Sequence, residues 1–320
     1  MSDSIKLEKI EINPQNLSIS DNYKVLVLSG GGSKGFILLG VLHRIFNSQS
    51  LDKRSAFSNL EAFVGTSIGS IICFLIIIGL TPVEILSAIC TGEFSGFSLH
   101  VNISLLFSNC GVLSIENLFD PVQKKTEEIL GFIPTMSELY ELFHKEFVCV
   151  THNITLDETV YIDHLSHPNL SCIEALKMSC NIPFIFEKYL YDKCFFIDGA
   201  FSDNFAVEYT CSRYKDKKIL GLYIEKGNSL IRENYKDDIM NYTECILSLS
   251  VRMNSKKSKK FQSSLLETIM VTVGDNFPDL KLNPSQQFES FSLGYKAVQS
   301  TKDSKVKDTL EEEKTKFKKD

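Results

Sequence analysis

The residues best placed to do chemistry are those around a serine flanked by glycines. Gly65-Thr66-Ser67-Ile68-Gly69 fits the pattern G-x-S-x-G, in which a serine occupies a sharp turn between a strand and a helix. An apolar segment precedes it and a longer one follows, as the pattern requires. The glycines allow a strained turn that exposes the hydroxyl at a helix N-terminus, where the dipole favours negative charge. Ser67 is the candidate nucleophile, although a serine that only caps a helix would occupy the same position.

A second motif is the glycine-rich loop of residues 30–35, Gly-Gly-Gly-Ser-Lys-Gly. It lies between an apolar segment and a helical one, so its backbone N–H groups can point at an anion or a polarised oxygen. The loop also satisfies the dinucleotide pattern G-x-G-x-x-G, and Asp52 lies at about the distance of the expected ribose ligand, but in a polar stretch. Phe36 and Ile37 replace the Lys and Ser/Thr of a Walker A loop, which excludes that interpretation. Alone, the loop is equally compatible with close packing of a helix on a strand.

An aspartate at the end of an apolar segment is the third candidate. Asp198 follows the apolar residues 194–197, and the small Gly199 and Ala200 leave room for a neighbouring group. Functional groups collect at strand ends in α/β folds. Apolar neighbours should desolvate the carboxylate and raise its pKa towards the range of a general base. An isolated Asp-Gly pair would instead only order a turn.

The histidines do not complete an ordinary serine-hydrolase triad. In α/β-hydrolases the chain order is Ser, then Asp or Glu, then His. His167 is the last histidine and precedes Asp198. The histidines are therefore better explained as surface or packing residues.

Taken together, the three motifs resemble those of the patatin-like phospholipases, a family of lipid acyl hydrolases. Residues 30–35 match the family's oxyanion-hole loop, 65–69 its nucleophile elbow and 198–200 its catalytic aspartate motif, in the family order. Residues 175–186 are similar to the family's helix leading into an Ile-Pro stretch. The resemblance covers about residues 24–212.

One departure from the family pattern follows the aspartate motif. The family commonly has Asn-x-Pro where this chain has Asn204-Phe205-Ala206. The difference concerns the geometry of that loop and leaves the serine and the aspartate unaffected.

The resemblance implies a mechanism without an imidazole. Asp198 would take the proton of Ser67, which would attack a fatty-acyl ester of a phospholipid or lysophospholipid, and water would cleave the acyl-enzyme. The resemblance assigns the oxyanion hole to the backbone N–H groups of Gly31, Gly32, Ser33 and Lys34. The other motif positions are Gly30, Gly35, Gly65, Gly69, Gly199 and Ala200. No cofactor and no metal are implied. The alternatives are a dinucleotide-binding protein that uses the glycine loop and a catalytically inactive lipid-binding scaffold.

Short apolar segments alternating with helical ones predict the elements that position these motifs. Together they indicate an α/β protein with three α/β/α layers around a mostly parallel sheet, which is also the patatin-like fold. Strands are expected over residues 24–28, 61–64, 147–152, 158–162, 194–197, 218–224 and 268–273.

The composition excludes several classes of protein. Of the 320 residues, 43% are hydrophobic, which excludes a disordered chain, and the net charge of −6 argues against a nucleic-acid partner. Nine cysteines without a C-x-x-C pair predict reduced thiols and a cytoplasmic location. The lipid substrate that the resemblance implies adds the expectation of peripheral contact with a membrane surface. The longest apolar run, residues 71–78, is too short to cross a bilayer and is expected to be a buried helix.

The predicted organisation is an N-terminal extension (1–23), a catalytic domain (24–212), a C-terminal α/β portion on the same core (213–300) and a charged, frayed tail (301–320). Two segments could meet lipid. Residues 94–107 are rich in apolar side chains and would form an acyl channel, a lid or simply core. A basic cluster would contact anionic headgroups or, as the simpler interpretation, form a solvated helix face. It consists of Arg252, Lys256, Lys257, Lys259 and Lys260.

Overall fold

The computed structural model describes residues 7–13, 23–47, 57–91, 108–226, 239–274 and 282–298. Within these ranges the main sheet has nine strands in the order β1-β11-β10-β2-β3-β5-β9-β8, with β6 also paired to β5. The strands are β1 (Leu7–Asn13), β2 (Val25–Leu28), β3 (Ala62–Thr66), β5 (Glu146–Asn153), β6 (Glu158–Ile162), β8 (Tyr189–Tyr191), β9 (Cys194–Asp198), β10 (Ile219–Lys226) and β11 (Leu266–Val273). A separate parallel pair joins β4 (Gly111–Leu113) to β7 (Phe184–Phe186).

The centre of the main sheet is parallel and its additions are antiparallel. Strands β11, β10, β2, β3 and β5 run in the same direction. The other four strands join by antiparallel pairing: β1 pairs with β11, β6 and β9 pair with β5, and β8 pairs with β9. The sequence therefore predicts the fold class correctly, because the apolar runs of the central strands are those of a sheet buried on both faces.

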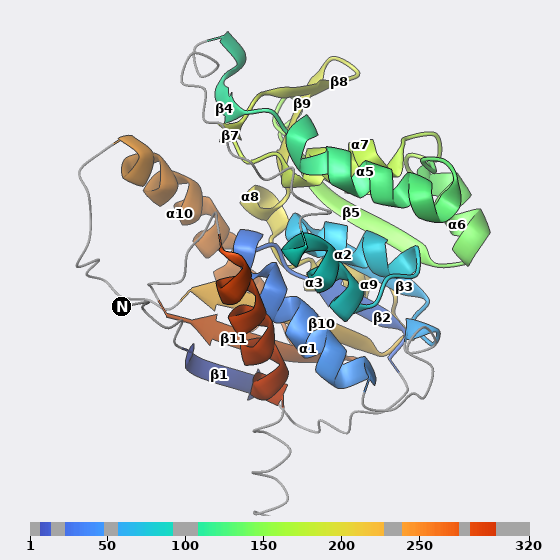
Figure 1. Ribbon diagram of the computed structural model, residues 1–320, viewed down its shortest axis with the longest axis vertical. Coiled ribbons are helices and arrows are strands. Elements are labelled where there is room, and N and C mark those ends of the chain that lie inside the picture. The colour runs from blue at the N-terminus through green and yellow to red at the C-terminus, as the bar shows by residue number, and fades with distance from the viewer. Residues whose placement is uncertain are drawn as a thin grey trace, which may run out of the picture.

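Side chains of the central strands alternate between two hydrophobic cores. Leu26 and Leu28 of β2 belong to the larger core, whereas Val25 and Val27 belong to a smaller one on the other face. Since successive residues of a strand point to opposite faces, helices must cover both sides of the sheet, and the layers in Figure 1 are arranged in this way.

The larger core is covered by most of the helices. They are α1 (Gly35–Asn47), α2 (Ile68–Ile77), α3 (Pro82–Cys90), α5 (Glu116–Leu130), α6 (Met136–Phe143) and α7 (Cys172–Cys180). On the other side lie α8 (Ala200–Asp203) and α9 (Val207–Arg213), with α10 (Ile239–Lys260) next to α8. A short 3-10 helix, η1 (Gly32–Lys34), precedes α1.

The apolar run at residues 71–78 lies in and just after α2, and its side chains are buried. The prediction of a buried helix is therefore confirmed. Among the described residues no single helix is long and apolar enough to cross a membrane; α2 and α3 meet the criterion only as a pair, and they are bent by 116° relative to each other.

The sequence does not indicate the strand at one edge of the sheet. Strand β1 lies within the predicted N-terminal extension and pairs with β11 at the edge of the sheet. The C-terminal strands β10 and β11 continue the same sheet next to β2. Residues 94–107 and 301–320 lie outside the described residues, and the domain boundaries stay a prediction.

Candidate active site

Ser67 and Asp198 meet because β3 and β9 approach each other along one edge of β5. Thr66, the last residue of β3, pairs with Val150 of β5. Asp198, the last residue of β9, pairs with the next residue of β5, Thr151. Since β3 runs parallel to β5 and β9 runs antiparallel to it, the two strands end facing each other. The register of β5 therefore brings together residues that are far apart in the sequence.

Ser67 occupies a tight turn between β3 and α2. Its backbone angles are φ 54° and ψ −126°, a combination that residues with a side chain rarely adopt. The flanking glycines permit this turn. A Cβ on Gly65 would lie 2.5 Å from the backbone of Ser70, and one on Gly69 would lie 2.6 Å from the carbonyl oxygen of Leu28. Any larger residue at either position would force the turn open.

The two side chains form a short hydrogen bond in a buried setting. The hydroxyl of Ser67 donates to Oδ2 of Asp198 at 2.6 Å, and the N–H of Ala200 donates to Oδ1 at 2.8 Å. Ser67 is 6% exposed and Asp198 is 2% exposed. Burial raises the pKa of Asp198 to about 6, although both hydrogen bonds oppose the rise. The carboxylate is thus more basic than an ordinary aspartate.

The end of α7 holds the backbone of both residues. The N–H of Ser67 donates to Oγ of Ser179 at 2.9 Å, and that hydroxyl donates to the carbonyl oxygen of Val150 at 2.6 Å. The N–H of Asp198 donates to the carbonyl oxygen of Asn181 at 2.9 Å. These contacts fix the strained turn and the strand end relative to each other. No sequence pattern indicates a role for Ser179 or Asn181, although both lie in residues 175–186, which resemble a family segment.

The glycine-rich loop begins directly beside the two side chains. The N–H of Gly30 donates to the carbonyl oxygen of Asn204 at 3.1 Å. A Cβ on Gly30 would lie 2.5 Å from Oδ1 of Asn204 and 3.3 Å from Cβ of Ser67. The loop therefore reaches the serine only because a glycine occupies this position. The carbonyl group of Asn204 thus holds the loop, although Ala206 replaces the proline of the family pattern.

The four expected oxyanion-hole residues are not equivalent. The N–H of Lys34 donates to the carbonyl oxygen of Gly31 at 3.1 Å, so it closes the turn of η1. Ser33 lies in the middle of that turn, and Gly35 begins α1. Within the described part of the chain, no hydrogen bond engages the N–H groups of Gly31 and Gly32. These two are the donors best suited to a substrate oxygen.

An apolar cavity adjoins the loop and the serine turn. Its lining combines Gly32 and Gly35 with Ile68 and other apolar side chains from α1, α2, α3 and α5. The cavity volume is about 50 Å³, well below the roughly 300–1,000 Å³ of a typical small-molecule pocket. A long ligand would need the surrounding helices to separate.

Other reactive groups do not contribute to this pair. The described histidines make no hydrogen bond to either side chain. Burial raises the pKa of the nearby Cys180 thiol well above its ordinary value, so this thiol stays neutral. All nine cysteines are free thiols. The described residues contain no cluster of His, Cys, Asp or Glu that could hold a metal ion, and Asp52 lies outside them.

Three comparisons place this geometry among known proteins. The sequence model of the patatin-like phospholipase family matches residues 26–210, more than half of the chain and all three motifs. A protein of Invertebrate iridescent virus 6 named "Probable lipid hydrolase 463L" is 33% identical over 214 residues, which are 64% of this chain and 69% of the relative. "Uncharacterized protein R571" of Acanthamoeba polyphaga mimivirus is 25% identical over 303 residues, 89% of this chain and 95% of that protein.

Among solved structures, that of VipD from Legionella pneumophila is similar in fold. It has a TM-score of 0.54 and 18% identity, over 95% of this chain and 72% of VipD. The family match and the viral lipid hydrolase do not favour the dinucleotide-binding alternative. The chain belongs to the patatin-like phospholipase family of lipid hydrolases.

Proposed function

We propose that this chain is a serine acyl hydrolase of the phospholipase A or lysophospholipase type. Ser67 would be the nucleophile and Asp198 its general base. The observation that carries the proposal is the 2.6 Å hydrogen bond between the two side chains, in a buried setting where burial raises the pKa of the acid to about 6. A nucleophile needs a base within about 2.6–3.2 Å.

The proposed reaction begins with attack on the ester. Asp198 accepts the hydroxyl proton as Ser67 Oγ forms a bond to the ester carbonyl carbon, and the carbonyl oxygen becomes an oxyanion. The amides of Gly31 and Gly32 donate to that oxyanion; loss of one such donor typically costs about 2.7–4 kcal/mol of transition-state stabilisation. The protonated Asp198 then gives its proton to the leaving alcohol oxygen as the ester bond breaks.

Water completes the cycle. Asp198, now ionised again, accepts a proton from a water molecule as its oxygen attacks the acyl-enzyme. The second tetrahedral intermediate collapses, the fatty acid leaves, and the proton returns to Ser67. A base with a pKa near 6 suits both halves, because it is mostly ionised at neutral pH and still basic enough to take the proton.

The apolar cavity supports a fatty-acyl substrate. A chain of methylene groups has no hydrogen-bonding needs, and the cavity beside Ile68 and the loop glycines offers only apolar side chains and backbone. Its small volume suggests that an acyl chain enters by separating α3 and α5 from α2. Such a substrate resides in a bilayer, so we also propose that the protein contacts a membrane surface peripherally.

The test measures products released from mixed phospholipid vesicles. We expect the unmodified protein to release fatty acids and lysolipids detectable by mass spectrometry. Ser67→Ala and Asp198→Asn should each lower the rate by about 10⁴-fold or more, with unchanged circular dichroism. Full activity in either folded variant would contradict the pair.

Covalent labelling separates an active enzyme from a scaffold that only binds lipid. A fluorophosphonate probe should label Ser67 in the unmodified protein and leave the Ser67→Ala variant unlabelled. An unlabelled wild-type protein that still binds vesicles would favour the scaffold.

A further inference from the structure

The outward face of α10 carries an exposed apolar stripe. Ile246, Leu249 and Met253 are 51%, 52% and 63% exposed. Their spacing of three and four residues places them on one side of the helix. Large apolar side chains scattered singly on a surface are ordinary, but three in line on one helix face mark an interaction surface.

Basic side chains extend the same face towards the end of the helix. Arg252, Lys256, Lys257 and Lys260 are all exposed, and each lies three or four residues, or one full turn, from a member of the stripe or from another of the four. Residues 245–260 contain no aspartate or glutamate. One of the four has an acidic neighbour from another element, since Lys257 pairs with Glu208 of α9 at 3.1 Å.

The inward face of α10 is fixed to the active-site region. Ser255 is buried, and the side-chain amide of Asn204 donates to its hydroxyl at 3.4 Å. The side-chain amide of Asn254 donates to the carbonyl oxygen of Phe201 in α8. Asn204 also holds Gly30 of the oxyanion loop. Figure 1 shows α10 at the periphery of the molecule, next to α8, so its position is coupled to the loop and the aspartate turn.

We propose that the outward face of α10 docks the protein on an anionic lipid surface, with Ile246, Leu249 and Met253 in the headgroup–acyl boundary and the basic side chains on lipid phosphates and carboxylates. The proposal deepens the function proposed above and rests on it, because it names the surface through which the hydrolase would meet its substrate.

Charge argues for an anionic bilayer as the occupant. The whole chain has a net charge of −6, so its overall field opposes approach to a negatively charged membrane, and attraction must come from a local basic surface. A helix with an apolar stripe bordered by Lys and Arg is suited to lie in the plane of such an interface.

Two double variants test the two components. Binding is measured in the Ser67→Ala background by co-sedimentation with vesicles of phosphatidylcholine alone or of phosphatidylcholine and phosphatidylserine in equal amounts. We expect Leu249→Asp with Met253→Asp to lower partitioning onto both vesicles by about tenfold or more. Arg252→Glu with Lys256→Glu should lower it by at least about tenfold on the anionic vesicles only.

Matched variants elsewhere control for added charge. Ile129→Asp with Leu142→Asp changes two exposed apolar helix residues on α5 and α6, and Lys124→Glu with Lys215→Glu reverses two exposed lysines away from α10. Both controls should bind vesicles like the parent. Equal binding by parent and α10 variants would overturn the proposal, as would a dimer in light scattering that only the Leu249→Asp, Met253→Asp variant abolishes.

Activity distinguishes failure of the docking surface from failure of the proposed function. With Ser67 intact, α10 variants should hydrolyse soluble p-nitrophenyl butyrate at the parent rate and vesicle phospholipid at least about tenfold more slowly. If no variant, including the parent, hydrolyses either ester while binding follows the pattern above, the enzyme assignment fails and the docking surface stands.

Discussion

Two carboxylates in this protein are equally shielded from solvent, but their pKa values are shifted in opposite directions. Asp198 and Asp163 are each 2% exposed. Asp198 accepts hydrogen bonds from a hydroxyl and one amide, and burial raises its pKa to about 6. Burial would also raise the pKa of Asp163, but the Ser166 and Leu165 amides and the Arg213 guanidinium outweigh it and lower that pKa.

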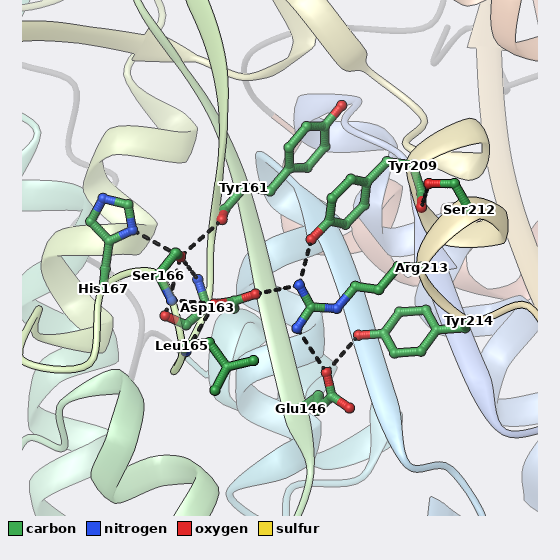
Figure 2. Close-up of polar contacts among 10 residues, drawn as sticks. All are labelled: Glu146, Tyr161, Asp163, Leu165, Ser166, His167, Tyr209, Ser212, Arg213 and Tyr214. Carbon is green, nitrogen blue, oxygen red and sulfur yellow. Dashed lines mark hydrogen bonds and ion pairs between the residues drawn. The ribbon is translucent and has the colours of Figure 1, made fainter.

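The two carboxylates lie towards opposite ends of β5. Asp198 pairs with Thr151 in the second half of that strand. Glu146 begins the strand, and Arg213 bridges it to Asp163 at N–O distances of 3.0 and 2.6 Å. Figure 2 shows the Arg213 guanidinium between the carboxylates of Asp163 and Glu146. The hydroxyl of Tyr214 also donates to Glu146. The difference shows that burial raises the pKa of a carboxyl group, whereas backbone amide donors together with a neighbouring guanidinium outweigh burial and lower it.

The largest expected effect comes from removing that cation. Arg213→Met leaves Asp163 buried and unpaired, and we expect the free energy of unfolding in urea to fall by about 3–5 kcal/mol. Ester hydrolysis per folded molecule should stay unchanged, because the ion pairs of Arg213 do not involve Ser67 or Asp198.

A second substitution shows whether charge is the cause. Asp163→Asn keeps the Oδ1 acceptor that the Leu165 and Ser166 amides use. Added to Arg213→Met, it should restore a large part of the lost stability, in a double-mutant cycle. Additive losses in the two variants would mean that packing, and not the ion pair, dominates this region.

The pH dependence of activity tests the other carboxylate. With a neutral soluble ester, kcat/KM should fall about tenfold per pH unit below a pKa near 6 and level off above it. The proton bound to Asp198 below this pH blocks its role as base. A profile flat down to pH 4 would contradict the raised pKa.

The dependence of folding stability on pH should have opposite signs for Asp198 and Asp163. A raised folded-state pKa means that Asp198 costs stability as pH rises from about 3.8 to about 6, and this shift corresponds to about 3 kcal/mol. Asp198→Asn should therefore gain stability relative to wild type over that range. Asp163, whose pKa is lowered, stabilises the fold above the unfolded-state pKa and loses this contribution as pH falls through its folded-state value.

The sequence predicts Ser67 and Asp198 as the candidate pair because each lies in a recognisable local sequence pattern. Gly65 and Gly69 are required by the close approach of backbone atoms, and Gly30 by the side chains of Asn204 and Ser67. Such glycines can be read directly from the sequence. The strand ends that carry Ser67 and Asp198 are equally visible as apolar runs. The fold class follows from the same alternation of apolar runs with helical segments.

Contacts between distant segments depend on how the strands and helices are placed in the fold, and no local sequence pattern indicates them. Nothing around Arg213 indicates that it joins Asp163 to Glu146, because the pairing requires β5, β6 and α9 to be placed first. Ser179 is similar, since a serine near a helix end is common. Its partners, Ser67 and Val150, come from two other elements.

Substitution of Ser179 is expected to have the smallest effect. It sharpens the comparison because the end of β5 near Ser67 is held by the neutral hydrogen bonds of Ser179, whereas the other end is held by ion pairs. Ser179→Ala leaves the N–H of Ser67 and the carbonyl oxygen of Val150 without their partner. We expect a loss of about 1–2 kcal/mol in unfolding free energy and a similar loss of transition-state stabilisation, or about tenfold in kcat, with KM nearly unchanged.

Ser290→Ala is the matched control for this change. Its hydroxyl is also fully buried and donates to a carbonyl oxygen, that of Gln286, in the helix of residues 284–298, away from the dyad. This variant should keep its kcat and lose less stability, because the carbonyl oxygen of Gln286 can still accept the N–H bond of the helix. If both variants keep kcat, Ser179 only supports the fold, and the strained turn of Ser67 is maintained by the glycines and β5 alone. If only Ser179→Ala lowers kcat, the Ser179 hydroxyl positions the proposed nucleophile, Ser67, relative to Asp198.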